Sequence, residues 1–182
     1  MRPRKPPTAL DEDALYTYAV RLLGTQMRTV AELKRLLRRR AALGEAGQAA
    51  LDAVIARLKE HRYLDDTGYA LDYAKLRQEN SSFGRRRVQQ DLMRKGVQAD
   101  VITKTLDTAY EGVGEEALAR RHLARKRIAQ PETDKDAARV ARLLLRAGFS
   151  SSTIVHILKK WNVDEAALTA FESAGADEPS DS

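Results

Sequence analysis

The sequence contains no cysteine and little proline or aromatic residue. Without cysteine, the chain has no disulfide, no thiolate metal ligand and no cysteine nucleophile. None of its five prolines falls between residues 9 and 130, a stretch rich in good helix formers such as Leu, Ala, Arg and Glu. No run of 18 apolar residues could span a membrane, and no segment alternates as a β-strand does. These absences predict an all-α protein of the cytoplasm.

The charge is distributed unevenly along the 182 residues. In total, 32 Lys and Arg face 26 Asp and Glu, for a net charge of +6. Six of the acids and none of the basic residues lie in 164–182, so residues 1–163 hold 20 acids and a net charge of +12. A body this basic attracts polyanions or acidic protein surfaces. We expect a flexible basic arm over 1–9 and an acidic tail over 164–182.

An internal repeat relates two parts of the chain at a fixed offset of 52 residues. Its apolar positions have the spacing of one helix face, followed by a glycine and then by the next helix. The glycine is expected just after a helix end, where left-handed backbone is required, and Asp100 or a serine within 150–152 is expected to cap the next helix. The matching residues are Val88, Leu92, Gly96, Val97, Ile102 and Leu106, which recur as Val140, Leu144, Gly148, Phe149, Ile154 and Leu158.

A further helix precedes each matching pair, so each repeat is expected to comprise three short helices. A poorer third copy lies near the N-terminus, where the loop over 41–47 is longer. Units of this size bury too little surface to be stable alone, and neighbouring repeats should therefore pack on one another. The sequence predicts an all-α fold of three tandem three-helix repeats, over 10–64, 65–112 and 113–163, which form an elongated, curved body.

The candidate catalytic and metal-binding motifs lack the neighbouring elements or residues that such sites require. The motif over 112–117 fits G-x-G-x-x-A, but a dinucleotide site needs a preceding strand, and a helix end precedes it here. None of the three histidines has a second ligand at metal spacing, and no nucleophile has a base beside it. Asp65 and Asp66 are expected to cap and stabilise the start of a helix rather than to bind Mg²⁺. We predict no catalytic residue, no metal and no cofactor. That the protein is an enzyme is a further hypothesis, but no group of residues in the sequence favours it.

Basic clusters are the strongest functional signal, with one in each predicted repeat. Cations at helix C-termini complement the helix dipole, and this explains part of the first and third clusters. It does not explain the arginines at 85–87, which are expected to open a helix, where cations are unfavourable. We expect the clusters to contact a partner. They comprise Arg35, Arg38, Arg39 and Arg40; Arg85, Arg86, Arg87, Arg94 and Lys95; and Arg120, Arg121, Arg125, Lys126 and Arg127.

The spacing Leu92-x3-Gly96-x5-Ile102 also fits the core of a helix-turn-helix motif. Direct, sequence-specific DNA binding is therefore an alternative hypothesis. The leucine is bulky where sequence-specific binders usually carry a small residue. The second helix of the pair carries few cations on its outside, which makes it a poor element for meeting phosphates. Those outer residues are Asp100, Thr103, Lys104 and Asp107.

Several motifs resemble the bacterial regulatory protein RecX family, over roughly residues 14–161. The resemblance rests on Tyr63-Leu64-Asp65-Asp66 leading into Tyr69-Ala70, then on Phe83-Gly84 followed by the arginines at 85–87. Leu92-x-x-Lys95-Gly96-Val97 and Gly148-Phe149-Ser150 follow in the same order. We identify Leu64, Asp65, Asp66, Gly84, Gly96, Gly148 and Phe149 as its structural signature.

The resemblance to RecX implies a fold of three tandem three-helix repeats and a non-enzymatic regulator of the RecA recombinase in DNA recombination and repair. Members of this family lie along the groove of the RecA–DNA filament and bridge neighbouring protomers. They inhibit ATP hydrolysis, co-protease activity and strand exchange, and they limit filament growth. The implied partners are the RecA filament and single- and double-stranded DNA without sequence specificity, and we expect a monomer.

Overall fold

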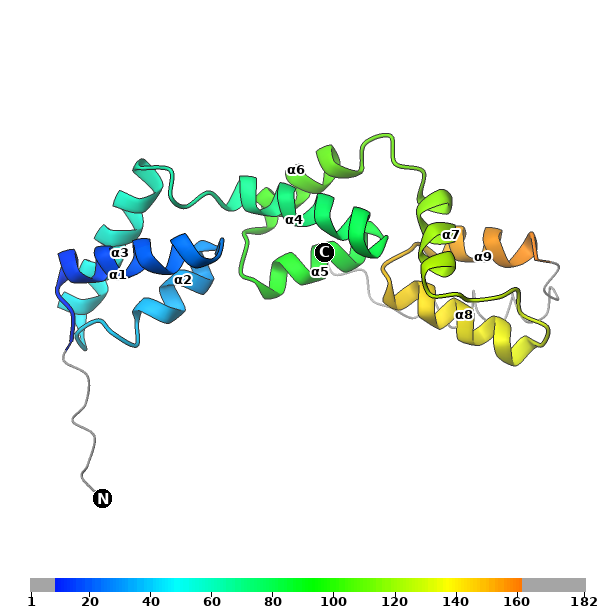
Figure 1. Cartoon of the computed structure of the whole chain (residues 1–182), viewed down its shortest axis with the longest axis horizontal. Helices are drawn as coiled ribbons and strands as arrows, with labels where there is room; N and C mark the ends of the chain where they lie inside the picture. Colours follow the sequence, from blue (N-terminus) through cyan, green and yellow to red (C-terminus); the bar gives the residue numbers. More distant parts are fainter. Residues whose placement is uncertain (1–8, 162–182) are drawn as a thin grey trace, which may run out of the picture. The chain divides into compact units, whose positions relative to one another are not determined.

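Nine α-helices and no β-strand make up residues 9–161, which are the part of the chain that the computed structural model describes (Figure 1). The prediction of an all-α fold is confirmed. The expected basic arm, except for its last residue, and the acidic tail lie outside the described residues. The helices are α1 (Glu12–Thr25), α2 (Val30–Leu37), α3 (Glu45–Glu60), α4 (Asp66–Ser81), α5 (Arg85–Arg94), α6 (Ala99–Tyr110), α7 (Glu115–Arg125), α8 (Asp134–Arg146) and α9 (Ser151–Lys159).

Side-chain caps begin several of these helices. The Asp11 carboxylate accepts from Ala14 N at 2.9 Å and caps α1, and Thr29 forms a reciprocal capping box with Glu32 at the start of α2. Ser150 caps α9, as expected, by accepting from Thr153 N. The expected cap at Asp100 is wrong, because α6 already begins at Ala99 and Asp100 lies in its first turn, where its charge favours the helix dipole.

Two glycines end α5 and α8 as the repeat predicts. Gly96 and Gly148 have φ angles of 76° and 88°, which a residue without Cβ adopts without strain. At the first, Val97 N donates to Leu92 O at 3.2 Å, and at the second, Phe149 N donates to Leu144 O, also at 3.2 Å. This is the double-bonded helix end of the Schellman type, in which the residue after the glycine folds back onto the last turn.

The described residues form two compact units. The N-terminal unit comprises residues up to Asp72 together with Leu92–Thr105, and the C-terminal unit comprises Tyr73–Asp91 together with residues from Leu106 on. The division crosses α4, α5 and α6. The repeat boundaries at 64/65 and 112/113, and the stacking of the repeats into one elongated body, stay predictions.

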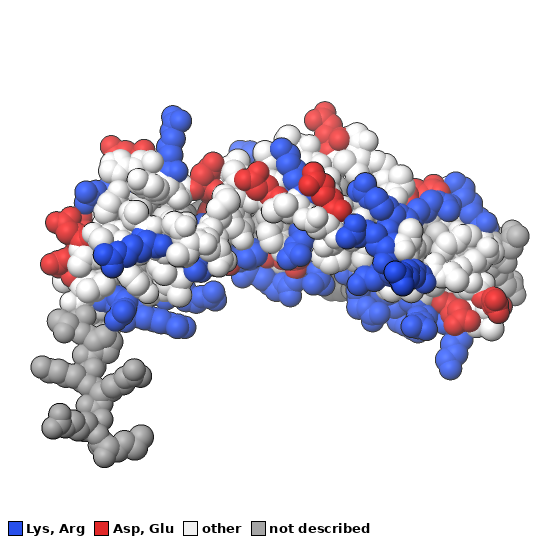
Figure 2. All heavy atoms as spheres, viewed as in Figure 1, with Lys and Arg blue, Asp and Glu red and all other residues white. Residues whose placement is uncertain are grey.

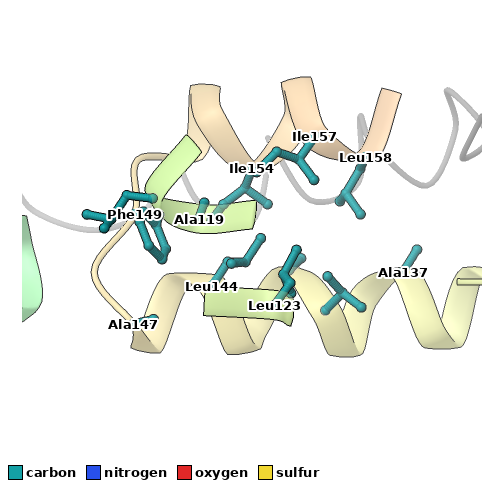
Figure 3. Close-up of a cluster of buried hydrophobic side chains, with 12 residues drawn as sticks. Ala119, Leu123, Ala137, Leu144, Ala147, Phe149, Ile154, Ile157 and Leu158 are labelled. Carbon is teal, nitrogen blue, oxygen red and sulfur yellow. The ribbon is translucent and has the colours of Figure 1, made fainter. Parts of the chain in front are cut away.

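Each unit has its own hydrophobic core. In the N-terminal unit, Leu15 of α1, Leu33 of α2 and Leu58 of α3 are fully buried. In the C-terminal unit, Leu144 of α8 and Ile154 of α9 point toward one another beside α7 (Figure 3). The apolar residues that the repeat predicted on one helix face, among them Leu92, Leu144 and Ile154, are therefore buried, and the opposite helix faces are left to the charged residues.

Candidate functional site

The start of α2 is held against the turn between α5 and α6, within the N-terminal unit. Thr29 Oγ1 donates to Lys95 O at 2.7 Å, and Val30 N donates to Asp66 Oδ1 at 2.9 Å. A Cβ on Gly96 would lie 2.4 Å from the Cβ of Ala31. Burial raises the pKa of Asp66, although the hydrogen bond from Val30 acts in the opposite direction. Two signature residues, Asp66 and Gly96, thus join segments that are far apart in the sequence.

The start of α5 is held in the same way against the turn between α8 and α9, within the C-terminal unit. Gly84 N donates to Ala147 O at 2.8 Å, and a Cβ on Gly84 would lie 2.3 Å from Gly148 O. The two accepting residues, Lys95 and Ala147, are separated by the same offset of 52 residues as the repeat. In both junctions the residue before a helix donates to the carbonyl that precedes a turn glycine.

The remaining signature residues stabilise local structure. Asp65 Oδ1 accepts from Thr67 N at 2.9 Å and so caps α4, as the sequence predicted. Leu64 and Phe149 are buried in the two cores. The signature therefore comprises caps, turns and core positions. The side chains available to a partner are instead the charged ones on the helix surfaces.

The first basic cluster lies at the end of α2 and is exposed. Arg35, Arg38 and Arg39 are solvent-exposed, and no ion pair holds them among the described residues. The guanidinium of Arg40 instead lies over the ring of Tyr18, 5.4 Å from its centroid. Figure 2 shows Lys and Arg side chains gathered along α2. This cluster presents positive charge to solvent.

The second cluster opens α5 as expected, but several of its members have partners within the chain. Arg85 Nη1 lies 2.7 Å from Asp107 Oδ1, and Arg87 Nε lies 3.3 Å from Asp91 Oδ1 but makes no hydrogen bond with it. These carboxylates offset the unfavourable cations at the helix start. Arg86 and Arg94 are exposed.

Lys95, the last member of this cluster, lies in the junction described above. Its Nζ is 3.0 Å from Glu32 Oε1, and both side chains are partly buried. Burial alone would lower the pKa of Lys95, but hydrogen bonds with Tyr69 and Glu32 outweigh it and raise the pKa above its ordinary value. The ammonium group therefore stays charged, and its ion pair with Glu32 connects α2 to the residue that follows α5.

The third cluster, on α7, mostly fastens that helix to the end of α4. Arg121 Nε donates to Ser82 Oγ at 3.1 Å, and its Nη2 donates to Gln78 O at 3.3 Å. Arg125 donates to Asn80 O, and Arg120 donates to Glu116 at 2.9 Å. Lys126 and Arg127, beyond the helix end, are exposed.

The predicted basic clusters leave out a set of arginines on α8. Arg139, Arg142 and Arg146 are exposed, and no ion pair holds them among the described residues. Their spacing of three and four residues puts them on one face, away from the buried Val140 and Leu144. Figure 2 shows basic side chains gathered around the end of α8. This spacing is visible in the sequence, and it could have placed the set among the clusters.

Several exposed arginines share a structural position. Arg35, Arg86 and the three arginines of α8 lie on α2, α5 and α8, which are the second helices of the three predicted repeats. Arg21 of α1 and Arg127 beyond α7 are exposed as well. The third helix of the middle repeat, α6, presents no such set: Asp107 pairs with Arg85, and Thr103 Oγ1 donates to Ala99 O at 2.9 Å. Exposed cations on the second helices suit contacts with phosphates, which position a protein without reading base sequence.

The other candidate sites of the sequence have structural explanations. Gly114 precedes α7, and α6 rather than a strand precedes the motif that resembled a dinucleotide loop. His122 is buried, donates to Ser81 O at 2.8 Å and packs between Phe83 and Phe149. Across residues 9–161, no group of His, Asp and Glu could hold a metal ion, and no helix is long and apolar enough to cross a membrane.

Comparisons with known proteins agree on one family. A family sequence model described as "RecX, second three-helix domain" matches residues 65–106. The regulatory protein RecX of Trichlorobacter lovleyi is 33% identical over 149 residues, which cover 80% of this chain and 94% of the relative. That of Mycobacterium leprae is 32% identical over 161 residues, covering 84% and 89%. The relative from Bacillus cytotoxicus is 36% identical over 91 residues, but the match spans only 32% of its length.

Solved structures show the same fold. A crystal structure of regulatory protein RecX superposes with a TM-score of 0.67 at 24% identity, covering 82% of this chain and 71% of the other. The crystal structure of RecX from Lactobacillus salivarius gives a TM-score of 0.66 at 20% identity, covering 84% and 97%. Both are similar to this chain in the arrangement of their helices.

Proposed function

We propose that this chain, which belongs to the regulatory protein RecX family, is a non-enzymatic regulator of the RecA recombinase. The family membership confirms the resemblance found in the sequence motifs. The chain binds along the groove of the RecA–DNA filament as a monomer in the cytoplasm, and it limits ATP hydrolysis, strand exchange and filament growth. A ligand that binds one state of a filament more tightly shifts the filament toward that state.

The observation that carries the proposal is the set of exposed arginines on α2 and α8, together with Arg86 of α5. Several weak cationic contacts on one chain add up on a polymeric partner, because after the first contact the others form within a single complex. No base-reading helix is needed, since the filament supplies a repeating array of phosphates and protein surface.

The direct test is the DNA-dependent ATPase of RecA, measured with increasing amounts of the purified chain. We expect inhibition at or below one chain per recombinase protomer. Replacing Arg35, Arg38 and Arg39 with Gln should weaken the inhibition, whereas replacing the exposed Lys59, Lys75 and Lys159 removes the same charge elsewhere and should weaken it less. An ATPase rate that the wild-type chain leaves unchanged at every ratio would contradict the proposal.

A gel shift on DNA alone discriminates the alternative of a helix-turn-helix regulator. Contacts with phosphates only should weaken with rising salt and show the same affinity for unrelated sequences. A strong preference for one DNA site would instead favour base readout. The outer face of α6, with Asp100 and Asp107, argues against such readout.

A further inference from the structure

Leu43, in the loop between α2 and α3, is the most exposed large apolar residue that the structure describes. It is 97% exposed, whereas the other large apolar residues at the surface, Met27, Tyr63, Leu76 and Met93, are exposed by between 53% and 56%. Partial exposure of single apolar residues is normal on a protein surface. A leucine that is almost completely exposed contributes next to nothing to the stability of its own fold, so its apolar surface is available to a partner.

The backbone on both sides of Leu43 is held by contacts with other parts of the N-terminal unit. Before it, Leu10 N donates to Arg40 O at 2.8 Å. Next to it, the carbonyl of Ala42 packs directly against α3, because a Cβ on Gly47 would lie 1.8 Å from Ala42 O. The loop therefore follows a defined path that leaves Leu43 in solvent.

The tip of this loop is also narrow. Leu43 lies between Ala42 and Gly44, and neither of these carries a side chain larger than a methyl group. An exposed leucine with such small neighbours fits a narrow groove, and the minor groove of duplex DNA is about 6 Å wide. Proteins that bind there often insert a leucine or another apolar side chain between two base pairs, which unstacks the pairs and bends the duplex.

The charge beside Leu43 indicates which class of partner fits. Residues 33–45 contain five Lys and Arg and a single acid. Arg35, Arg38 and Arg39 are exposed, and no ion pair holds them among the described residues. Leu43 is four residues beyond Arg39, so their Cα atoms are at most about 14 Å apart. A DNA strand has one phosphate for about every 3.4 Å of axis, so phosphates on either side of a base step lie within reach of the arginines.

We propose that Leu43 is a wedge that enters the minor groove of duplex DNA and separates two stacked base pairs, while the arginines at the end of α2 hold the flanking phosphates. The inference rests on the DNA contacts of the proposed function and adds a mode of binding to them, in which the duplex is bent without base readout. An apolar pocket on an acidic protein also accepts a leucine, but a row of exposed arginines beside a narrow tip matches the evenly spaced phosphates along a groove.

The test compares Leu43→Ala with the control Leu76→Ala in the full-length chain. Leu76 is an exposed leucine of α4, so the control removes the same side chain elsewhere. The probe is a short DNA duplex with a fluorophore pair at its ends and 2-aminopurine inside it. We expect the wild type to bend the duplex by about 20–90°, which shortens the end-to-end distance, and to raise the 2-aminopurine fluorescence as bases unstack. Leu43→Ala should lose both signals and bind several-fold more weakly, whereas Leu76→Ala should behave as the wild type does.

Two further measurements separate insertion from other effects of the substitution. Leu43→Met keeps an apolar side chain of similar size and should bend the duplex as the wild type does. Leu43→Ala should keep the wild-type slope of log K against log salt, because its arginines still contact the phosphates. Thermal unfolding followed by circular dichroism should show that each variant is folded, since position 43 packs against almost nothing.

Three outcomes would overturn the wedge while leaving the regulatory function intact. In the first, the wild type binds the duplex without bending it, and in the second, Leu43→Ala bends it as the wild type does. In the third, Leu43→Ala loses affinity only for the RecA–DNA filament, which would make Leu43 an anchor for protein. A wild-type chain that binds neither duplex DNA nor the filament would overturn the proposed function itself, so the two failures are distinguishable.

Discussion

The turn glycines show how single residues make the junctions possible. Gly148 has a φ of 88°, and a Cβ there would lie 2.2 Å from Arg87 N. The Gly148→Ala variant should therefore lose about 2 kcal/mol or more of unfolding free energy, because strain and steric overlap act together. Urea unfolding measures the change.

Gly24 supplies the matched control for that substitution. It lies within α1, and a Cβ there would meet no atom within 4 Å. The Gly24→Ala variant should gain about 0.5–1 kcal/mol of unfolding free energy, since alanine is the better helix former. Equal effects at the two glycines would contradict the assignment of Gly148 to a close packing position.

Local rules made some residue assignments predictable. The positions of Gly96 and Gly148 followed from the repeat and from the backbone that a helix end requires, and Asp65 was expected at a helix cap. The partner of Asp66 was not predictable, because its bond to Val30 joins residues 36 positions apart. For the same reason the burial of His122 was not predictable, because it depends on contacts with Phe83 and Phe149, which are distant in the sequence.

At the scale of elements, Glu115 joins the start of α7 to the start of α9. It accepts from Ser150 N at 2.8 Å and from Ser150 Oγ and Thr153 Oγ1 at 2.5 Å. Burial alone would raise its pKa, but these hydrogen bonds and the charge of Arg86 outweigh it and hold the pKa below the ordinary 4.5. The ionised carboxylate is thus the form that stabilises the fold.

The stability that Glu115 contributes should depend on pH in a defined direction. Because its folded pKa is lowered, the contribution is fully present above pH 4.5 and is lost as the pH falls from there through the lowered value. The wild type should lose more unfolding free energy than Glu115→Gln between pH 7 and pH 3, as urea unfolding at both values would show. Equal losses in the two proteins would refute the role of this carboxylate.

The arginines of α7 and α8 differ in what they contact, and the sequence pattern does not distinguish them. Arg121→Ala should lose about 1 kcal/mol of unfolding free energy, because it removes donors to Ser82 and Gln78. Arg142→Ala on α8 should change it by less than about 0.5 kcal/mol, because Arg142, which is exposed like Arg121, donates no hydrogen bond within residues 9–161. The helices were predictable from periodicity, but the α4 carbonyls that hold α7 come from another element.

For the whole molecule, the net charge of +12 on residues 1–163 predicts binding that depends on salt. Each phosphate that an arginine neutralises contributes about −0.9 to the slope of log K against log salt on duplex DNA. Replacing Arg139, Arg142 and Arg146 with Gln should therefore make the slope less steep by about 0.9 for each phosphate that the variant no longer neutralises. Fluorescence anisotropy of labelled DNA, titrated between low and moderate salt, measures this slope.

The exposed Lys59, Lys75 and Lys159 again supply the control, because their replacement removes the same total charge from outside the second helices. If only the net charge attracted DNA, both triple variants would change the slope alike. If α8 forms the contact surface, the arginine variant changes it more, since the slope reports phosphates that are contacted and not charge at a distance. The difference between the two variants thus decides whether DNA contacts the second helices or responds to the basic body as a whole.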